Sequence, residues 1–177
     1  RCLSLLHIQW NHGVKEYMAP VFERCRVAAT KEKKTKNYEF SWDSALKNSG
    51  NSGIKLQYSH SRLCNLLEVN SHIEIPQDLS LIDFELLCEP EAIKLVLTLA
   101  QFDENLASSY RHLEPSILVK YLFLLCNDIS KAIKVLKVKG TDEETAVLRL
   151  LLFTVSKKVL HHGMCILGLK PLEKMWK

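Results

Sequence analysis

The last third of the chain repeats apolar residues at the spacing of an α-helix, and this pattern limits the fold more than any other feature. Apolar side chains recur every three or four residues after Pro115, at Ile117, Leu118, Tyr121, Leu122, Leu125, Ile129, Ala132, Ile133 and Leu136. Such spacing predicts a long helix with one buried stripe. Residues 137–140 end this helix, and a second long helix is expected from about Asp142 to Leu167.

The ends of the second helix carry sequence signals of their own. Thr141 and Glu144 fit a capping box, in which the threonine oxygen accepts a hydrogen bond from the backbone near Glu144 and the glutamate reaches back. Gly168 suits a left-handed exit from the helix, and Pro171 follows as a stop. We therefore expect two antiparallel helices joined by a short loop.

Shorter helices are predicted before this pair. They run from about Gly53 to Val69, over residues 81–88, and from Glu89 to about Tyr110. The expected buried stripe of the last one comprises Ile93, Leu95, Val96, Leu99, Ala100 and Leu106. No strand pattern repeats and no alternation of strands with helices occurs. The predicted fold class is therefore all-α, an antiparallel helical bundle with short connections.

Charge is unevenly distributed along the chain, whose net charge is +4. The net charges of residues 1–43, 44–110 and 111–177 are +3, −5 and +6. A basic end beside an acidic middle indicates an anionic partner that binds at one place. Ordinary solvated lysine side chains explain the same asymmetry, so charge alone leaves both interpretations open.

Basic residues in the last third are candidates for contacts with a nucleic-acid backbone. One group recurs every three residues beside an apolar stripe, and a second group lies near the end of the following helix. The first group is Lys131, Lys134 and Lys137, and the second is Lys157, Lys158, His161 and His162. In an antiparallel pair these groups lie at opposite ends. We therefore expect two positive patches, suited to phosphates along an extended strand or loop.

The sequence contains no cluster that is typical of catalysis or metal binding. Asp142 and the two glutamates after it open a helix, which explains them better than acid–base chemistry. The six cysteines show no paired spacing, which predicts a reducing compartment, no disulfide framework and no zinc site. No apolar run approaches the roughly 18 residues of a membrane span. The chain begins at Arg1 rather than Met, so we expect a piece of a longer polypeptide.

Two stretches of sequence carry a family resemblance. Residues 38–43 read Tyr-Glu-Phe-Ser-Trp-Asp, residues 50–53 read Gly-Asn-Ser-Gly, and residues 56–63 read Leu-Gln-Tyr-Ser-His-Ser-Arg-Leu. The tail of the chain contains Gly163-Met164, Leu167-Gly168-Leu169, Pro171 and Met175. In order and spacing these motifs resemble the C-terminal anticodon-binding (DALR) domain of arginyl-tRNA synthetases, most closely the mitochondrial type. The resemblance implies an all-helical domain over residues 37–177, preceded by a poorly matched segment and charged loop at 1–36.

The resemblance implies specific roles for single residues. Tyr58 and Met175 match two residues that form walls around an anticodon base in the family, and a ring and a thioether can enclose an unstacked base. The alternative for Tyr58 is core packing with a bonded hydroxyl. Arg62 matches the family's arginine one turn further on and is expected to orient a phosphate. Some relatives carry aromatic residues where this chain has Ile133 and Lys137, so charge at Lys137 replaces a second stacking contact.

The resemblance also implies an activity for the parent protein. That activity is ATP-dependent attachment of arginine to tRNA(Arg), with a catalytic domain elsewhere in the same polypeptide and a location in the mitochondrial matrix or, alternatively, the cytoplasm. The HIGH and KMSK motifs of class I synthetases are absent, since Leu6-His7-Ile8 is not a HIGH motif. We therefore expect no catalytic residue and no cofactor in this chain. Two alternatives stay open: a non-catalytic tRNA-binding adaptor, and a helical protein-interaction module.

Overall fold

The described part of this computed structural model covers residues 25–31, 33, 51–76 and 84–175, and it is helical without any strand. The elements are α3 (Gly53–Val69), the 3-10 helix η3 (Phe84–Leu86), α4 (Pro90–Ala100), α5 (Phe102–Arg111), α6 (Pro115–Val135) and α7 (Glu143–Ile166). Residues 25–30 are also helical. The predicted all-α bundle is confirmed. No helix within the described ranges has the length and apolar character needed to cross a bilayer.

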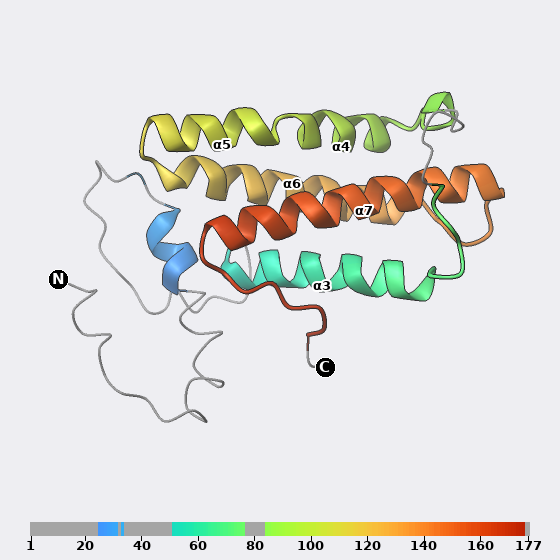
Figure 1. The fold of residues 1–177 in the computed structure, drawn as a ribbon, viewed down its shortest axis with the longest axis horizontal. Helices are drawn as coiled ribbons and strands as arrows, with labels where there is room; N and C mark the ends of the chain where they lie inside the picture. The colour runs from blue at the N-terminus through green and yellow to red at the C-terminus, as the bar shows by residue number, and fades with distance from the viewer. Residues whose placement is uncertain (1–24, 32, 34–50, 77–83, 176–177) are drawn as a thin grey trace.

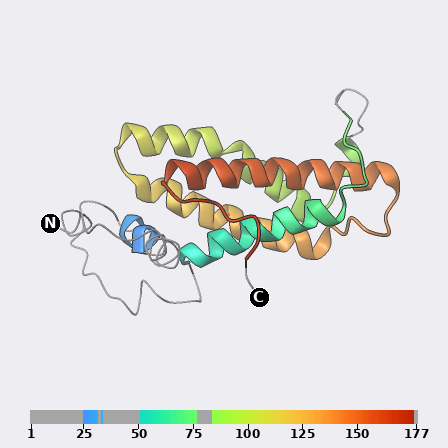
Figure 2. The ribbon, with the colours of Figure 1, turned by 60° about the horizontal axis from the view of Figure 1, so that its bottom comes forward.

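Long helices lie side by side along one axis of the molecule (Figure 1). α3 and α6 run in the same direction and α7 runs opposite to both. α4 and α5 pack on α6, and α3 packs against both α6 and α7. Turning the molecule shows that α4 and α5 lie on the side of α6 away from α3 (Figure 2). Within the described ranges, the main helix contacts of α3 are therefore those with α6 and α7.

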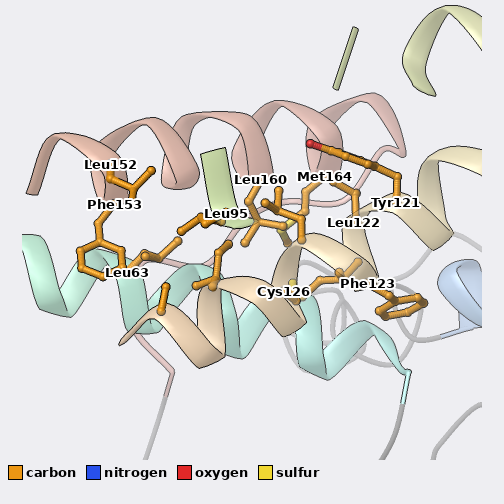
Figure 3. Close-up of a cluster of buried hydrophobic side chains, with 14 of the residues drawn as sticks. Leu63, Leu95, Tyr121, Leu122, Phe123, Cys126, Leu152, Phe153, Leu160 and Met164 are labelled. Atoms are coloured by element: carbon orange, nitrogen blue, oxygen red, sulfur yellow. The ribbon is translucent and has the colours of Figure 1, made fainter. Parts of the chain in front are cut away.

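The core lies where α3, α4, α6 and α7 meet (Figure 3). Its fully buried side chains include Leu56, Leu63, Leu95, Leu118, Leu122, Leu125, Ile129, Phe153, Leu160 and Met164. Most of the stripe predicted on α6 is in this core. Burying one large apolar side chain contributes about 1.5–3 kcal/mol to the free energy of unfolding. The packing of these four helices is therefore the main source of stability.

Gly163 allows α7 to approach α6 closely. A Cβ atom at Gly163 would lie 2.5 Å from Cδ2 and 3.3 Å from Cγ of Leu122. Leu122 is fully buried, so it has little room to move away. The hydrogen in place of a side chain is what lets the two helices pack at this distance.

The predicted single helix over residues 89–110 is wrong, because Gln101 separates α4 from α5. The backbone amide of Gln101 bonds the carbonyl oxygen of Thr98 at 3.3 Å, which is the spacing of a 3-10 turn. The same carbonyl accepts a hydrogen bond from the Tyr121 hydroxyl at 3.0 Å. A partner on another helix thus occupies the acceptor that would continue the α-helix.

The stripe predicted for this segment is also partly wrong. Ile93 and Val96 are 49% and 46% exposed, whereas Ala92, Leu95 and Thr98 are buried. α4 contacts α6 along this narrower row with a spacing of three residues. Val96 instead lines an apolar groove between α4 and α7. The periodicity therefore identified the helix correctly, but the buried face that it predicted was wider than the one observed.

The predicted capping box at the start of α7 is wrong. Asp142, not Thr141, caps the helix: its carboxylate accepts a hydrogen bond from the backbone amide of Thr145 at 3.0 Å. The Thr141 hydroxyl donates to the carbonyl oxygen of Val138 at 2.9 Å and so closes the preceding turn. Hydrogen bonding by Thr145 holds the pKa of Asp142 below its ordinary value. A carboxylate at this position also suits the positive end of the helix dipole.

The predicted exit from α7 at Gly168 is confirmed. Gly168 has φ +70°, its amide bonds the carbonyl oxygen of Cys165, and the Leu169 amide bonds that of Met164. This pair of bonds is the Schellman motif. The Arg26 guanidinium also donates to the Gly168 carbonyl oxygen. The turn directs the following residues back along α3.

Some predictions concern residues outside the described ranges. These are the charged loop at 30–37 beyond residue 33, the aromatic segment at 38–43, the Gly-Asn-Ser-Gly turn as far as residue 50, and residues 81–83 of the helix expected at 81–88. In the described part of the helix expected at 81–88, only a short 3-10 helix forms, at Phe84–Leu86.

Candidate nucleic-acid interface

Residues 169–175, here called the C-terminal tail, lie along α3 (Figure 1). Gln57 of α3 binds this tail with both ends of its side-chain amide. Its Nε2 donates to the carbonyl oxygen of Lys170 at 2.9 Å, and its Oε1 accepts from the backbone amide of Leu172 at 2.9 Å. Gln57 is only 6% exposed, so water competes little for these bonds.

His60 and Ser61 hold the tail one turn further along α3. The Nδ1 of His60 lies 2.8 Å from the carbonyl oxygen of Leu172, and the Ser61 Oγ accepts from the backbone amide of Met175 at 3.1 Å. Because a carbonyl oxygen only accepts, Nδ1 carries the hydrogen in this bond. The tail is therefore fixed through its backbone.

The backbone of Met175 is bound one helical turn from Tyr58 on α3. Tyr58 is 56% exposed, which excludes the alternative that it packs in the core. Ser61, which binds the Met175 amide, follows Tyr58 by one helical turn, a spacing that brings side chains to about 5–6 Å at Cβ. Met175 and Arg62 are each partly buried. Tyr58 and Arg62 thus lie one turn apart on α3, and the backbone of Met175 is bound to the turn between them at Ser61.

The basic residues of α7 lie in part beside the tail. Lys157 is partly buried and lines a groove of about 410 Å³ together with Cys64, Leu67, Glu68, Glu173 and Lys174. Lys174 forms an exposed ion pair with Glu68 at 3.0 Å. His161 is exposed, and its Nδ1 lies 3.2 Å from Nε2 of His60. Lys158 is exposed on the same helix.

The basic residues near the C-terminal end of α6 lie away from the C-terminal tail. Lys131, Lys134 and Lys137 are exposed, and Lys131 lines a groove of about 180 Å³ with residues of α4. The carbonyl oxygen of Lys137 accepts a hydrogen bond from Arg149, which precedes His161 by twelve residues on α7. At about 1.5 Å rise per residue this is roughly 18 Å along the helix. The structure therefore separates the two basic groups, and only the α7 group adjoins the tail.

Burial changes the pKa of His60, which lies at the centre of this site. It is 1% exposed, and this burial lowers its pKa below the ordinary value. The bond to the Leu172 carbonyl acts in the opposite direction, while the charges of His161 and Lys157 lower the pKa further. His60 is therefore held neutral, with Nδ1 bonded to the tail and Nε2 free to accept a hydrogen bond from His161.

Sequence reasoning missed the residues that dock the tail. Gln57, His60 and Ser61 lie inside the motif at residues 56–63 that carries the family resemblance, but that motif predicts roles only for Tyr58 and Arg62. The available signal was the pair of bulky polar residues Gln57 and His60 on the same face as Leu56 and Leu63. A polar side chain on a buried helix face needs a partner, and here the partners are backbone groups of the tail.

The fold and the docked tail define an all-helical domain whose last residues are bound along α3. A family model described as "DALR anticodon binding domain" matches residues 56–175. The chain therefore belongs to the DALR anticodon-binding domain family, as its motifs indicated. Its curated relatives are arginyl-tRNA synthetases, of which two serve as examples.

One relative is "Probable arginine--tRNA ligase, cytoplasmic" of Dictyostelium discoideum, 42% identical over 143 residues that cover 81% of this chain and 24% of the relative. Another is "Arginine--tRNA ligase, mitochondrial" of Saccharomyces cerevisiae, 38% identical over 146 residues that cover 82% of this chain and 22% of the relative. The chain thus spans about a quarter of the length of these relatives. They include both cytoplasmic and mitochondrial proteins.

Solved structures show the same fold. The Thermus thermophilus arginyl-tRNA synthetase matches with a TM-score of 0.79 and 23% identity over 94% of this chain and 28% of that one. The Plasmodium falciparum arginyl-tRNA synthetase matches with a TM-score of 0.71 and 23% identity over 92% and 30%. The helical anticodon-binding fold expected from the sequence is confirmed by these structures.

Proposed function

We propose that this chain binds the anticodon loop of an arginine tRNA with the face of α3 that Tyr58 and Met175 share. The observation that carries the proposal is the docking of the tail, which binds the backbone of partly exposed Met175 to Ser61, one helical turn from exposed Tyr58. Unstacked bases of RNA loops are bound by stacking on aromatic side chains. Arg62 is suited to a phosphate of the same loop, and Lys157, Lys158 and His161 to the backbone that leads away from it.

The longer protein that contains this domain is proposed to be an arginine–tRNA ligase. Its curated relatives carry that name and are about four times as long as the matched region. In this proposal the catalytic domain of the same polypeptide uses ATP to attach arginine, and residues 37–177 recognise the tRNA. We propose a mitochondrial location, since the motifs resemble that branch of the family.

A binding assay with altered RNA tests this function. The chain is titrated into labelled tRNA(Arg) transcript and into the same transcript with its anticodon loop replaced by an unrelated sequence. We expect the loop replacement to weaken binding at least about tenfold, because each lost base contact removes about 1–3 kcal/mol. Equal affinity for the two transcripts would reject recognition of the anticodon loop.

The basic residues give a prediction about salt. Replacing both Lys157 and Lys158 by Gln should weaken tRNA binding. It should also reduce the slope of log affinity against log salt concentration by about 1.4, since each lost phosphate contact to single-stranded RNA accounts for about 0.7. A smaller change is expected for Lys131, Lys134 and Lys137, which lie away from the tail. Exposed Lys94 of α4 is the control. A slope unchanged in the double variant, or reduced equally by Lys94→Gln, would argue against a specific contact.

A further inference from the structure

The C-terminal tail has neither helix nor strand of its own beyond the turn at Gly168. Its backbone groups are instead bound by side chains of α3. Four of these bonds, at 2.8–3.1 Å, come from Gln57, His60 and Ser61. These residues are three and four positions apart, so they lie on one face of the helix. A face of α3 therefore substitutes for the partner strand that an extended segment usually needs.

The geometry of these bonds shows what the face recognises. Gln57 presents a donor and an acceptor to Lys170 and Leu172, as a peptide group of a neighbouring strand would. None of the four bonds involves a side chain of the tail. The contact therefore fixes where the tail backbone lies and leaves the side chain of Met175 free for another task.

We propose that Gln57, His60 and Ser61 are positioning residues of the RNA-binding face, which hold the tail backbone against α3 so that Met175 lies beside Tyr58. This inference rests on the proposed function and deepens it. The tail is then a required part of the base-binding site. RNA affinity depends on how completely the tail is docked, because a chain with an undocked tail lacks one wall of the site.

The histidine pair makes this docking sensitive to pH. His60 binds the tail with Nδ1 and faces His161 with Nε2 at 3.2 Å. The groups that act on His60 are His161 and Lys157 of α7, Glu173 of the tail, and Cys64 of α3 at 3.7 Å. A second proton on His60 would remove the acceptor for His161 and place a charge beside Lys157. Burial, His161 and Lys157 lower the pKa of His60, although its bond to Leu172 and the charge of Glu173 act in the opposite direction. The neutral form of His60 therefore fits the docked arrangement, and we expect docking to weaken as the pH falls below the ordinary value of 6.5.

The first test compares tail docking with RNA affinity in the same variants of the full chain. Docking is measured without RNA, by hydrogen–deuterium exchange of the Leu172 and Met175 amides, and affinity by titration of tRNA(Arg) transcript. For Gln57→Leu we expect exchange at Leu172 to rise at least about tenfold and affinity to fall about tenfold, because both tail bonds of that side chain are lost. Thr98→Val is the matched control, since it removes one buried hydrogen bond to Asp128 and lies outside the tail contact.

The outcomes separate this inference from the proposed function. If the unmodified chain does not bind tRNA(Arg), the proposed function fails and this inference fails with it. If the chain binds and Tyr58→Ala weakens binding, but Gln57→Leu loosens the tail without loss of affinity, only this inference is overturned. Loss of affinity with an undisturbed tail also overturns it, since Gln57 would then act by another route.

The second test uses the conservative replacement of His60. The side-chain amide of Asn places a donor close to the position of Nδ1 and does not titrate, whereas Leu offers no donor. We expect His60→Asn to keep the affinity of the unmodified chain at about pH 7.5 and His60→Leu to lose most of it. Between about pH 7.5 and pH 5.5 the unmodified chain should lose several-fold more affinity than His60→Asn. Equal pH profiles, or equal losses in the Asn and Leu variants, would contradict the assigned role of His60.

Discussion

Tyr58→Ala is expected to weaken the binding of tRNA(Arg) by roughly 5- to 150-fold, which corresponds to the about 1–3 kcal/mol of one base–aromatic stack. The same change should leave the free energy of unfolding within about 0.5 kcal/mol, because more than half of the Tyr58 side chain faces solvent. Affinity is measured by filter binding and stability by thermal unfolding of the same preparations. A large effect on binding with almost none on stability is the signature of a contact residue.

Two further variants make this result specific. Tyr58→Phe keeps the ring and loses only the hydroxyl, so we expect it to bind within a few-fold of the unmodified chain. Tyr110→Ala removes an aromatic side chain that is 78% exposed on α5, outside the proposed face. If Tyr110→Ala weakened binding as much as Tyr58→Ala, the effect would reflect non-specific contacts between exposed aromatic side chains and RNA. The proposed face would then be rejected.

Phe153→Ala is expected to have the opposite signature, a loss of about 3–5 kcal/mol in the free energy of unfolding. Phe153 of α7 is fully buried and lies beside Leu63 of α3 in the core (Figure 3). Removing the ring forfeits its burial and leaves a cavity between α7 and α3. Urea unfolding followed by circular dichroism measures the loss.

A variant of the same helix serves as the control for Phe153. Val155→Ala shortens a side chain that is 39% exposed, and we expect it to cost less than about 1 kcal/mol. The folded fraction of Phe153→Ala, measured at low temperature, should still bind tRNA(Arg) with nearly unchanged affinity. A loss below 1 kcal/mol for Phe153→Ala would contradict the core described here.

The sequence was sufficient to predict the helices because their burial is periodic. The bounds of α3 and the left-handed exit at Gly168 depend on local signals and matched the structure. The break at Gln101 was not predictable in this way, since it depends on the hydroxyl of Tyr121, which approaches from another helix. The cap at Asp142 was missed because Thr141 and Asp142 are both good capping residues, and only the turn before them decides between the two.

The candidate site was predictable only in part, for a similar reason. Tyr58 and Met175 were identified through the family resemblance, and their spacing along the chain does not reveal that the tail is bound one turn from Tyr58. The path of the tail is set by Gln57 and His60 through backbone atoms that have no sequence signature. The separation of Lys137 from His161 followed directly from the antiparallel order of α6 and α7, which periodicity and loop length already indicated.

A double-mutant cycle between Tyr58 and Met175 tests most directly whether one base lies between them. Affinity for tRNA(Arg) is measured for the unmodified chain, Tyr58→Ala, Met175→Ala and the double variant. If both side chains enclose the same base, the losses are not additive: the double variant should bind more tightly than the sum of the single losses implies, by about 0.5–3 kcal/mol. Losses that add within about 0.3 kcal/mol, or no loss for Met175→Ala, would show that the two residues do not act on one base.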